Sequence, residues 1–222
     1  MLKLSCVLAT AAISTAFCFS GCTQEKEKIV IHGIMPELTE SELILNSDLI
    51  ISGSVSEILN SKWSNENLEK GENIPNILQT DIIIDVDEVI EGDCINNYVT
   101  VRINKGENED TVVYSEGYPD FTEGEQVLLF LARDDSGLAT DEDYYVLTGM
   151  KQGKYSLKEN NTDVYSNDVK AEASYVNDKN TIDIDTLQSA IEKENEANPD
   201  YKTEKSIRQE EIKKENEELF GE

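Results

Sequence analysis

The chain has 222 residues, a length typical of one domain with appendages or of two small domains. Its 46 acidic and 19 basic residues leave a formal net charge of −27, which excludes nucleic-acid binding through a basic face and docking on anionic lipid through a polybasic patch. The apolar fraction of 38%, with nine tyrosines and five phenylalanines, is enough for a core.

The N-terminus has the pattern of an export signal. Lys3 precedes an uncharged, mostly apolar stretch from Leu4 to Phe19. This stretch is too short to span a membrane comfortably, which takes about 20 residues, but it suits the apolar region of a signal peptide. The sequence FSGC, which ends at Cys22, resembles the lipobox of bacterial lipoproteins. The resemblance implies a signal peptide over residues 1–21 and linkage of Cys22 to diacylglycerol.

Lipidation of Cys22 implies a protein held on the extracytoplasmic face of the cell membrane, because two acyl chains anchor a protein stably. Residues 22–35 would then be the lipidated cysteine and its tether. Cys94 would be the one cysteine left unmodified, so the fold is expected to need no internal disulfide. The bias toward Asn, Lys, Ile and Glu is typical of an AT-rich bacterial genome and suggests a Gram-positive source.

Local patterns predict a short extended segment from Ile29 to Met35 and then a short helix from Glu40 to Asn46. Thr39 and Glu42 have the spacing of a capping box, in which each side chain accepts a hydrogen bond from the other residue's backbone N–H. The helix would bury Leu43 and its neighbours.

The middle of the chain predicts β structure. Apolar and polar residues alternate with a period of two, which is typical of strands with one buried and one solvated face. On this basis Asp81, Asp85 and Asp87 lie on a solvated face, with Arg102 across the sheet in an ordinary charged surface. Gln126–Ala132 is apolar on both faces and is expected to be the most buried strand. The predicted strands are Leu49–Leu59, Thr80–Ile90, Tyr98–Asn104, Thr111–Tyr114, Gln126–Ala132, Asp143–Thr148 and Lys154–Leu157.

These elements predict a mainly β fold, a small antiparallel barrel or sandwich over residues 36–160 with its leading short helix. Residues 161–198 are expected to form a polar connection and a packed helix, capped by Asp183 or Asp185 and ended by Asn198-Pro199. Residues 199–222 form a charged helical tail. Two interpretations of this tail stay open, a solvated helix that frays and a helix that binds a partner.

Several segments together resemble a group of uncharacterised bacterial envelope proteins. These segments are SDLIISGSV, IDVDEVIEGD, VTVRI, GYPDFTEGEQVLLFL and YYVLTGMKQGKYSL. The layout is similar to the netrin-like or TIMP-like version of the five-stranded OB barrel, and it implies an OB-like fold while saying almost nothing about activity. TIMP-type inhibitors chelate zinc through a free N-terminal cysteine. Cys22 would be acylated, so that mechanism is not carried over.

The common catalytic signatures are absent from the sequence, including GxSxG, SxxK, the phosphate loop and HExxH. His32 is the one histidine, and it lies close to the tether, which is a poor platform for catalysis or for a histidine-based zinc site. Trp63 lies in a polar loop, where it either covers a mouth of the barrel or stacks on a ligand. Cys94 is read as a loop thiol rather than a nucleophile. No catalytic, metal or cofactor residue is therefore assigned.

The favoured hypothesis is a non-enzymatic binding or interaction module of the envelope, with the membrane and an envelope protein as its partners and no nucleic acid. One alternative is an envelope hydrolase that uses paired carboxylates. A second is a calcium-dependent adhesion or structural protein, for which the acidic stretch RDDSGLATDED is the most attractive segment. Its candidate ligands are Asp134, Asp135, Asp141, Glu142 and Asp143, but the EF-hand alignment puts Ala132 at the first ligand position.

Overall fold

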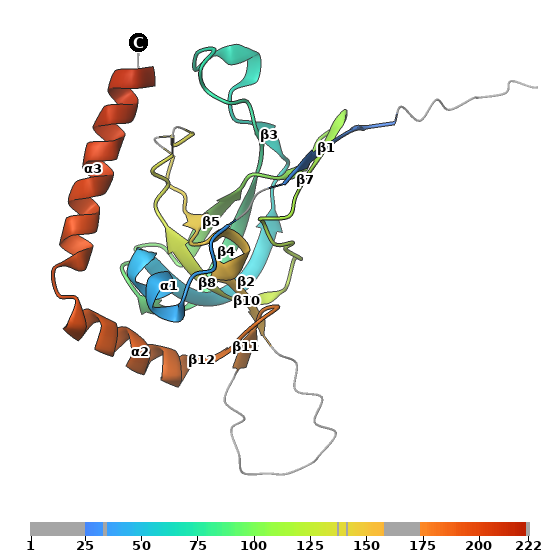
Figure 1. The fold of residues 1–222 in the computed structure, drawn as a ribbon. Helices are drawn as coiled ribbons and strands as arrows, with labels where there is room; N and C mark the ends of the chain where they lie inside the picture. The colour runs from blue at the N-terminus through green and yellow to red at the C-terminus, as the bar shows by residue number, and fades with distance from the viewer. Residues whose placement is uncertain (1–24, 33–34, 137, 141, 158–173, 221–222) are drawn as a thin grey trace, which may run out of the picture.

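The computed structural model describes residues 25–32, 35–136, 138–140, 142–157 and 174–220 (Figure 1). The structure is mainly β, with a short N-terminal helix and two C-terminal helices, as predicted. The strands are β1 (Glu27–Ile31), β2 (Leu49–Ile58), β3 (Lys62–Trp63), β4 (Leu78–Glu91), β5 (Tyr98–Ile103), β6 (Gly106–Glu107), β7 (Thr111–Ser115), β8 (Gln126–Ala132), β9 (Val146–Leu147), β10 (Lys154–Leu157), β11 (Ser174–Val176) and β12 (Thr181–Asp183). The helices are α1 (Glu40–Asn46), α2 (Ile184–Ala197) and α3 (Tyr201–Phe220), with 3₁₀ turns η1 (Glu66–Leu68) and η2 (Met150–Gly153).

The predicted capping residues define the helix ends. The Thr39 hydroxyl accepts the N–H of Glu42 at 3.2 Å, and the Glu42 carboxylate accepts the N–H of Thr39 at 2.8 Å, so the capping box of α1 is confirmed. Asp183 caps α2 by accepting the N–H of Thr186 at 2.8 Å. Asn198 ends α2, as predicted from the proline that follows it.

The main sheet follows the order β12-β11-β10-β8-β2-β4-β3, with β5 beside β4 and β9 beside β8. Its ladders do not close into a barrel. At the opening between β5 and β9, Val101 and Tyr145 form a parallel bridge, in which the Tyr145 carbonyl accepts the N–H of Arg102 at 2.8 Å. The result is a sandwich-like or partly open barrel. Strands β11 and β12 were not predicted, because they lie in a region that reads as a polar connection.

The main sheet has an apolar cluster on each face. One cluster lies inside the curve of β2, β4, β5, β8 and β9, and the other lies between the sheet and the helices α1 and α2. Strand β8 belongs to both, since Leu129 faces the first cluster and Phe130 the second, so the prediction that it is buried on both faces is confirmed. The alternation of β2 predicts a solvated face with Ser52, Ser54 and Ser56, and this is wrong at Ser52, which is buried. Its neighbour Ile50 packs in the cluster that also contains residues of α1 and α2.

A smaller sheet has the order β1-β7-β6, and β1 pairs with β7 in parallel. The predicted tether is therefore too long, since Glu27–Ile31 forms a strand of the folded domain. In Figure 1, the paired strands β1 and β7 extend from one side of the main sheet, and α3 stands along the opposite side. In the part of the chain that the structure describes, no helix is both long and apolar enough to cross a bilayer.

Candidate functional site

An ion pair is buried on the outer face of β4 and β5, away from the first apolar cluster. Asp81 and Arg102 lie directly opposite each other in the β4–β5 register. Arg102 donates from Nε to Asp81 Oδ1 at 2.6 Å and from Nη2 to Asp81 Oδ2 at 2.8 Å, a bidentate geometry. The side chain of Arg102 is 3% exposed and that of Asp81 is 9% exposed. The prediction that both belong to an ordinary charged surface is therefore wrong.

The segment between β8 and β9 covers this ion pair. The ring of Tyr144 lies on the Arg102 guanidinium, with 3.9 Å from Cζ to the ring centroid. Glu142 accepts a second hydrogen bond from Arg102 Nη2 at 2.6 Å. Lys62, at the edge, lies 3.4 Å from both carboxylates. We call Lys62, Asp81, Arg102, Glu142 and Tyr144 the Arg102 cluster; its two cations and two carboxylates balance in formal charge.

The pKa shifts in the Arg102 cluster follow from these contacts. Burial alone raises the pKa of Asp81, but the hydrogen bonds and charge of Arg102, helped by Lys62, outweigh burial and lower it. Burial likewise lowers the pKa of Arg102, and its bonds to Asp81 and Glu142 reverse this and raise it. All the formal charges of the cluster are thus held by partners within it, which makes the cluster a clamp between the loop and the sheet rather than an acid–base pair.

Tyr144 gives this clamp a pH dependence that can be measured. Burial and its hydrogen bond to Asp134, at 2.6 Å, raise its pKa from 10.0 to about 12. Because the pKa is raised in the folded state, the stability that the protonated Tyr144 contributes is fully present below about pH 10 and is lost as pH rises through about 12. Between those limits we expect the native protein to lose about 2–3 kcal/mol more than Tyr144→Phe. Urea unfolding across this range measures the difference, and identical pH slopes for the two proteins contradict the expectation.

A second polar group joins β10 to the start of β8. Lys154 Nζ donates to Glu125 Oε1 at 2.5 Å and to Ser156 Oγ at 3.2 Å, and Ser156 Oγ also donates to Glu125 Oε1 at 2.5 Å. A Ser–Lys pair resembles a nucleophile and its base, but Lys154 is the donor in both of its contacts here, whereas a general base accepts. The lysine side chain is 8% exposed, and its cation also faces the ring of Phe121 at 5.0 Å. The arrangement is that of a buried structural ion pair.

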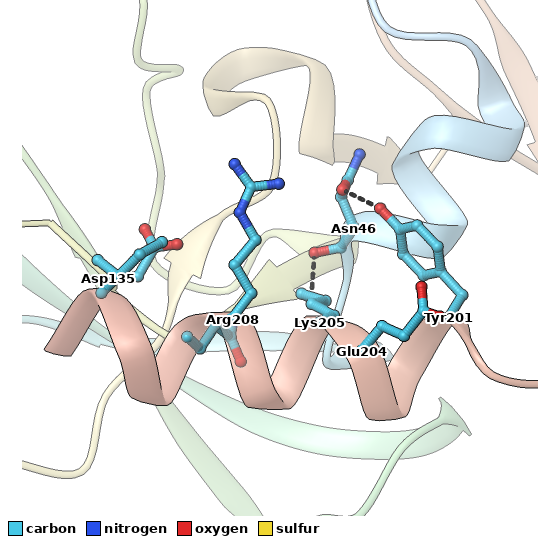
Figure 2. A pocket seen from close by; sticks show the side chains of 8 residues that line it. Asn46, Asp135, Tyr201, Glu204, Lys205 and Arg208 are labelled. Atoms are coloured by element: carbon cyan, nitrogen blue, oxygen red, sulfur yellow. Dashed lines mark hydrogen bonds between the residues drawn. The ribbon is translucent and has the colours of Figure 1, made fainter. Parts of the chain in front are cut away.

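A concave feature lies between α3 and the main domain (Figure 2). Its volume is about 370 Å³. We call it the α3 groove. Its lining residues are Asn46, Asp135, Tyr201, Glu204, Lys205, Arg208, Gln209 and Ile212.

Polar contacts from one stripe of α3 hold the helix beside the groove. Tyr201, Lys205 and Gln209 are spaced four residues apart and so share a face. The Tyr201 hydroxyl donates to Asn46 Oδ1 at 2.9 Å, and Lys205 Nζ donates to the Asn46 carbonyl at 2.6 Å (Figure 2). Lys205 Nζ also donates to Asp48 Oδ1 at 2.7 Å. Asp48 also accepts the backbone N–H of Arg133 at 2.7 Å, so α3 is fastened to the same residue that holds the start of the β8–β9 segment.

Arg208 extends its guanidinium from α3 into the α3 groove (Figure 2). Whereas Lys205 is engaged with Asn46 and Asp48, Arg208 presents a planar set of donors to the opening. Ile212, one turn further along the same helix, adds apolar surface. The lining of the α3 groove thus combines the cation of Arg208 and the apolar side chain of Ile212 with the carboxylates of Asp135 and Glu204.

The remaining candidates from the sequence are scattered. His32 is exposed and lies 3.3 Å from Glu116 in the smaller sheet, Trp63 pairs with Leu78 at the edge of the main sheet, and the thiol of Cys94 donates to the Asn96 carbonyl at 2.8 Å. Cys22 lies outside the described residues. These positions bring none of the candidate residues together in one site.

The acidic residues that follow β8 have different partners and do not form one site. Asp134 accepts from Tyr144, Asp143 pairs with Arg133 at 2.7 Å, and Glu142 belongs to the Arg102 cluster. Asp135 lines the α3 groove, and Asp141 lies outside the described residues. Among the residues that the structure describes, no group of three or more acidic, histidine or cysteine side chains is placed to hold a metal ion.

The sequence interpretation missed the α3 groove. The available signal was the polar stripe of Tyr201, Lys205 and Gln209 on one face of α3. Comparison with known proteins adds no relative, since no family model and no curated protein sequence matches the chain.

Proposed function

We propose that the protein is an extracytoplasmic lipoprotein, anchored through acyl chains on Cys22, that acts as a non-enzymatic binding module of the bacterial envelope. The α3 groove is the observation that carries the binding role. It is a concave surface of about 370 Å³ that lies between a charged helix and the β domain. Its partner is an envelope protein that places an acidic and an apolar side chain between α3 and the β domain.

The strand order supports the OB-like part of this proposal. Strands β2, β4, β5, β9 and β8 follow one another around a curved sheet, with the parallel contact between β5 and β9. An OB-type barrel is partly open, and its loops present the binding surface. The loop after β8 reaches the α3 groove through Asp135, so the β domain contributes directly to the surface we assign.

Charge also supports a binding role. The net charge of −27 keeps the molecule away from anionic wall polymers and soluble at the membrane surface. Arg208 places a cation inside the groove of this acidic chain. A carboxylate of the partner would be recognised by its close contact with this cation, because the overall electrostatic field of the chain is negative.

Crosslinking in living cells tests the groove. A photoreactive side chain at Ile212, in the α3 groove, is expected to capture one envelope protein, whereas the same group at the exposed Glu192 of α2 is not. Arg208→Glu is expected to lower the yield about tenfold or more, because it removes the partner of a carboxylate and adds repulsion. Lys193→Glu on α2 makes the same change in net charge away from the groove.

Two results would contradict the binding role. One is an equal yield from the Ile212 and Glu192 positions. The other is an equal loss of yield in Arg208→Glu and Lys193→Glu, since that result assigns the loss to net charge alone. A Cys22→Ala protein serves as the unanchored control, and recovery of nothing above its level overturns the proposal of an envelope partner.

A further inference from the structure

The outer face of the smaller sheet carries exposed apolar and basic side chains, together with the carboxylate of Glu107, which is paired with Lys26. Val30 and Tyr114 are direct partners in the parallel β1–β7 register, so their side chains lie on the same side of the sheet. They are 52% and 53% exposed. Lys28, two residues before Val30, lies on this side as well and is also exposed. We call Lys28, Val30 and Tyr114 the β1–β7 face.

The opposite side of the same sheet is turned toward the protein. Ile29 and Val113 form the adjacent pair in the register, and Val113 is only 4% exposed. On this opposite side β7 is packed through Val113, whereas Ile31 of β1 is 37% exposed. The side that carries Val30 and Tyr114 is the more exposed of the two, and it presents an aromatic ring, an aliphatic side chain and a cation to the surroundings.

We infer that the β1–β7 face rests on the membrane to which the protein is anchored, with Tyr114 and Val30 at the level of the lipid headgroups. This inference rests on the proposed lipidation of Cys22. Four residues lie between Cys22 and Glu27, the first residue of β1, and the five steps along the chain from Cys22 to Glu27 span at most about 18 Å. An acylated Cys22 therefore keeps β1 within that distance of the headgroups.

The chemistry of the β1–β7 face suits a lipid headgroup region. Tyrosine is enriched at membrane interfaces, because its ring is apolar and its hydroxyl remains hydrated. Lys28 is one of only 19 basic residues in a chain with 46 acidic ones, and its position on the same side as Val30 and Tyr114 allows it to meet a lipid phosphate. The acyl chains on Cys22 supply the affinity for the membrane. The β1–β7 face therefore needs only to orient the molecule on the bilayer, not to bind lipid by itself.

This orientation directs the α3 groove away from the bilayer. In Figure 1, β1 and β7 lie on one side of the main sheet and α3 lies on the opposite side. With the β1–β7 face on the lipid, the α3 groove opens toward the cell wall or the medium, where a partner can reach it. The two surfaces then have separate tasks, orientation and binding.

Depth-dependent fluorescence quenching tests the inference. The full-length lipoprotein, carrying Cys94→Ser so that one thiol is available, is labelled with bimane at Tyr114→Cys or at Ile207→Cys. Ile207 is a matched control, since it is 54% exposed and lies on α3. The proteins are inserted into vesicles of phosphatidylcholine and phosphatidylglycerol that include a lipid with a nitroxide on its headgroup. We expect at least about twofold quenching at position 114 and none at position 207, because the nitroxide quenches only a probe that reaches the headgroup region.

The outcomes separate the anchor from the orientation. The mass of the N-terminal peptide and partition into detergent report lipidation of Cys22 before any quenching is measured, and absence of the lipid overturns the proposed function. With the lipid present, equal quenching at positions 114 and 207 overturns the inference. Quenching at position 114 that falls as the protein density on the vesicles rises also overturns it, because a second copy of the chain then covers the face.

Discussion

Arg102→Met is expected to lower the free energy of unfolding by about 3–5 kcal/mol, since it leaves a buried carboxylate without its cation. Asp81 is 9% exposed, and both of its carboxylate oxygens accept hydrogen bonds from Arg102. Lys62 lies 3.4 Å from Asp81 but is half exposed, so it replaces little of the lost interaction. Urea unfolding at neutral pH, followed by circular dichroism, measures the loss.

Two further variants separate burial of charge from loss of packing. Asp81→Asn combined with Arg102→Met is expected to be less destabilising than Arg102→Met alone, because no unpaired buried charge remains. Glu142→Gln is expected to cost under about 1 kcal/mol, since Glu142 is 56% exposed. A loss below about 1 kcal/mol in Arg102→Met would mean that the segment over the ion pair opens and lets water reach Asp81.

Phe130→Ala is expected to lower the free energy of unfolding by about 3–5 kcal/mol through loss of buried area and creation of a cavity. Phe130 is fully buried on β8, and its ring centroid lies 5.9 Å from that of Tyr155 at a tilt of 54°. Its cluster also contains Ile44 of α1 and Leu187 of α2. The helix layer depends on this cluster for its attachment to the sheet.

Leu129→Ala is the matched control, because Leu129 is the adjacent residue on β8 and faces the other cluster. Its cost is expected to be about 2–5 kcal/mol. Amide hydrogen exchange distinguishes the two variants. Phe130→Ala is expected to accelerate exchange in α1 and α2, and Leu129→Ala in β4 and β5. The same exchange pattern in both variants would show that the clusters are not separate.

The substitutions at Phe130 and Leu129 also test the proposed binding role. Asn46, at the end of α1, receives Tyr201 and Lys205 of α3, and α1 is held on the sheet by the cluster that contains Phe130. A loosened α1 therefore displaces one wall of the α3 groove. We expect Phe130→Ala to reduce partner capture more than Leu129→Ala does when both proteins remain folded.

The sequence by itself determined the elements whose signals are local. Alternation with a period of two located β2, β4 and β5, the doubly apolar run located β8, and the capping box of Thr39 located the start of α1. For the start of α2 the sequence offered Asp183 or Asp185, and the structure has Asp183. Each of these signals depends on residues within one turn or one strand, where backbone preference and side-chain periodicity act together. The mainly β class follows from their sum.

Only the tertiary structure decided the sites. Arg102 and Asp81 have the alternation of a solvated face, and they are buried because the segment before β9 folds back over them from about forty residues away. The pairing of β1 with β7 joins segments about eighty residues apart, and the α3 groove exists because the helix after Pro199 is fastened by polar side chains to the start of β2. Such contacts depend on chain segments that meet only after folding, and no local periodicity records them.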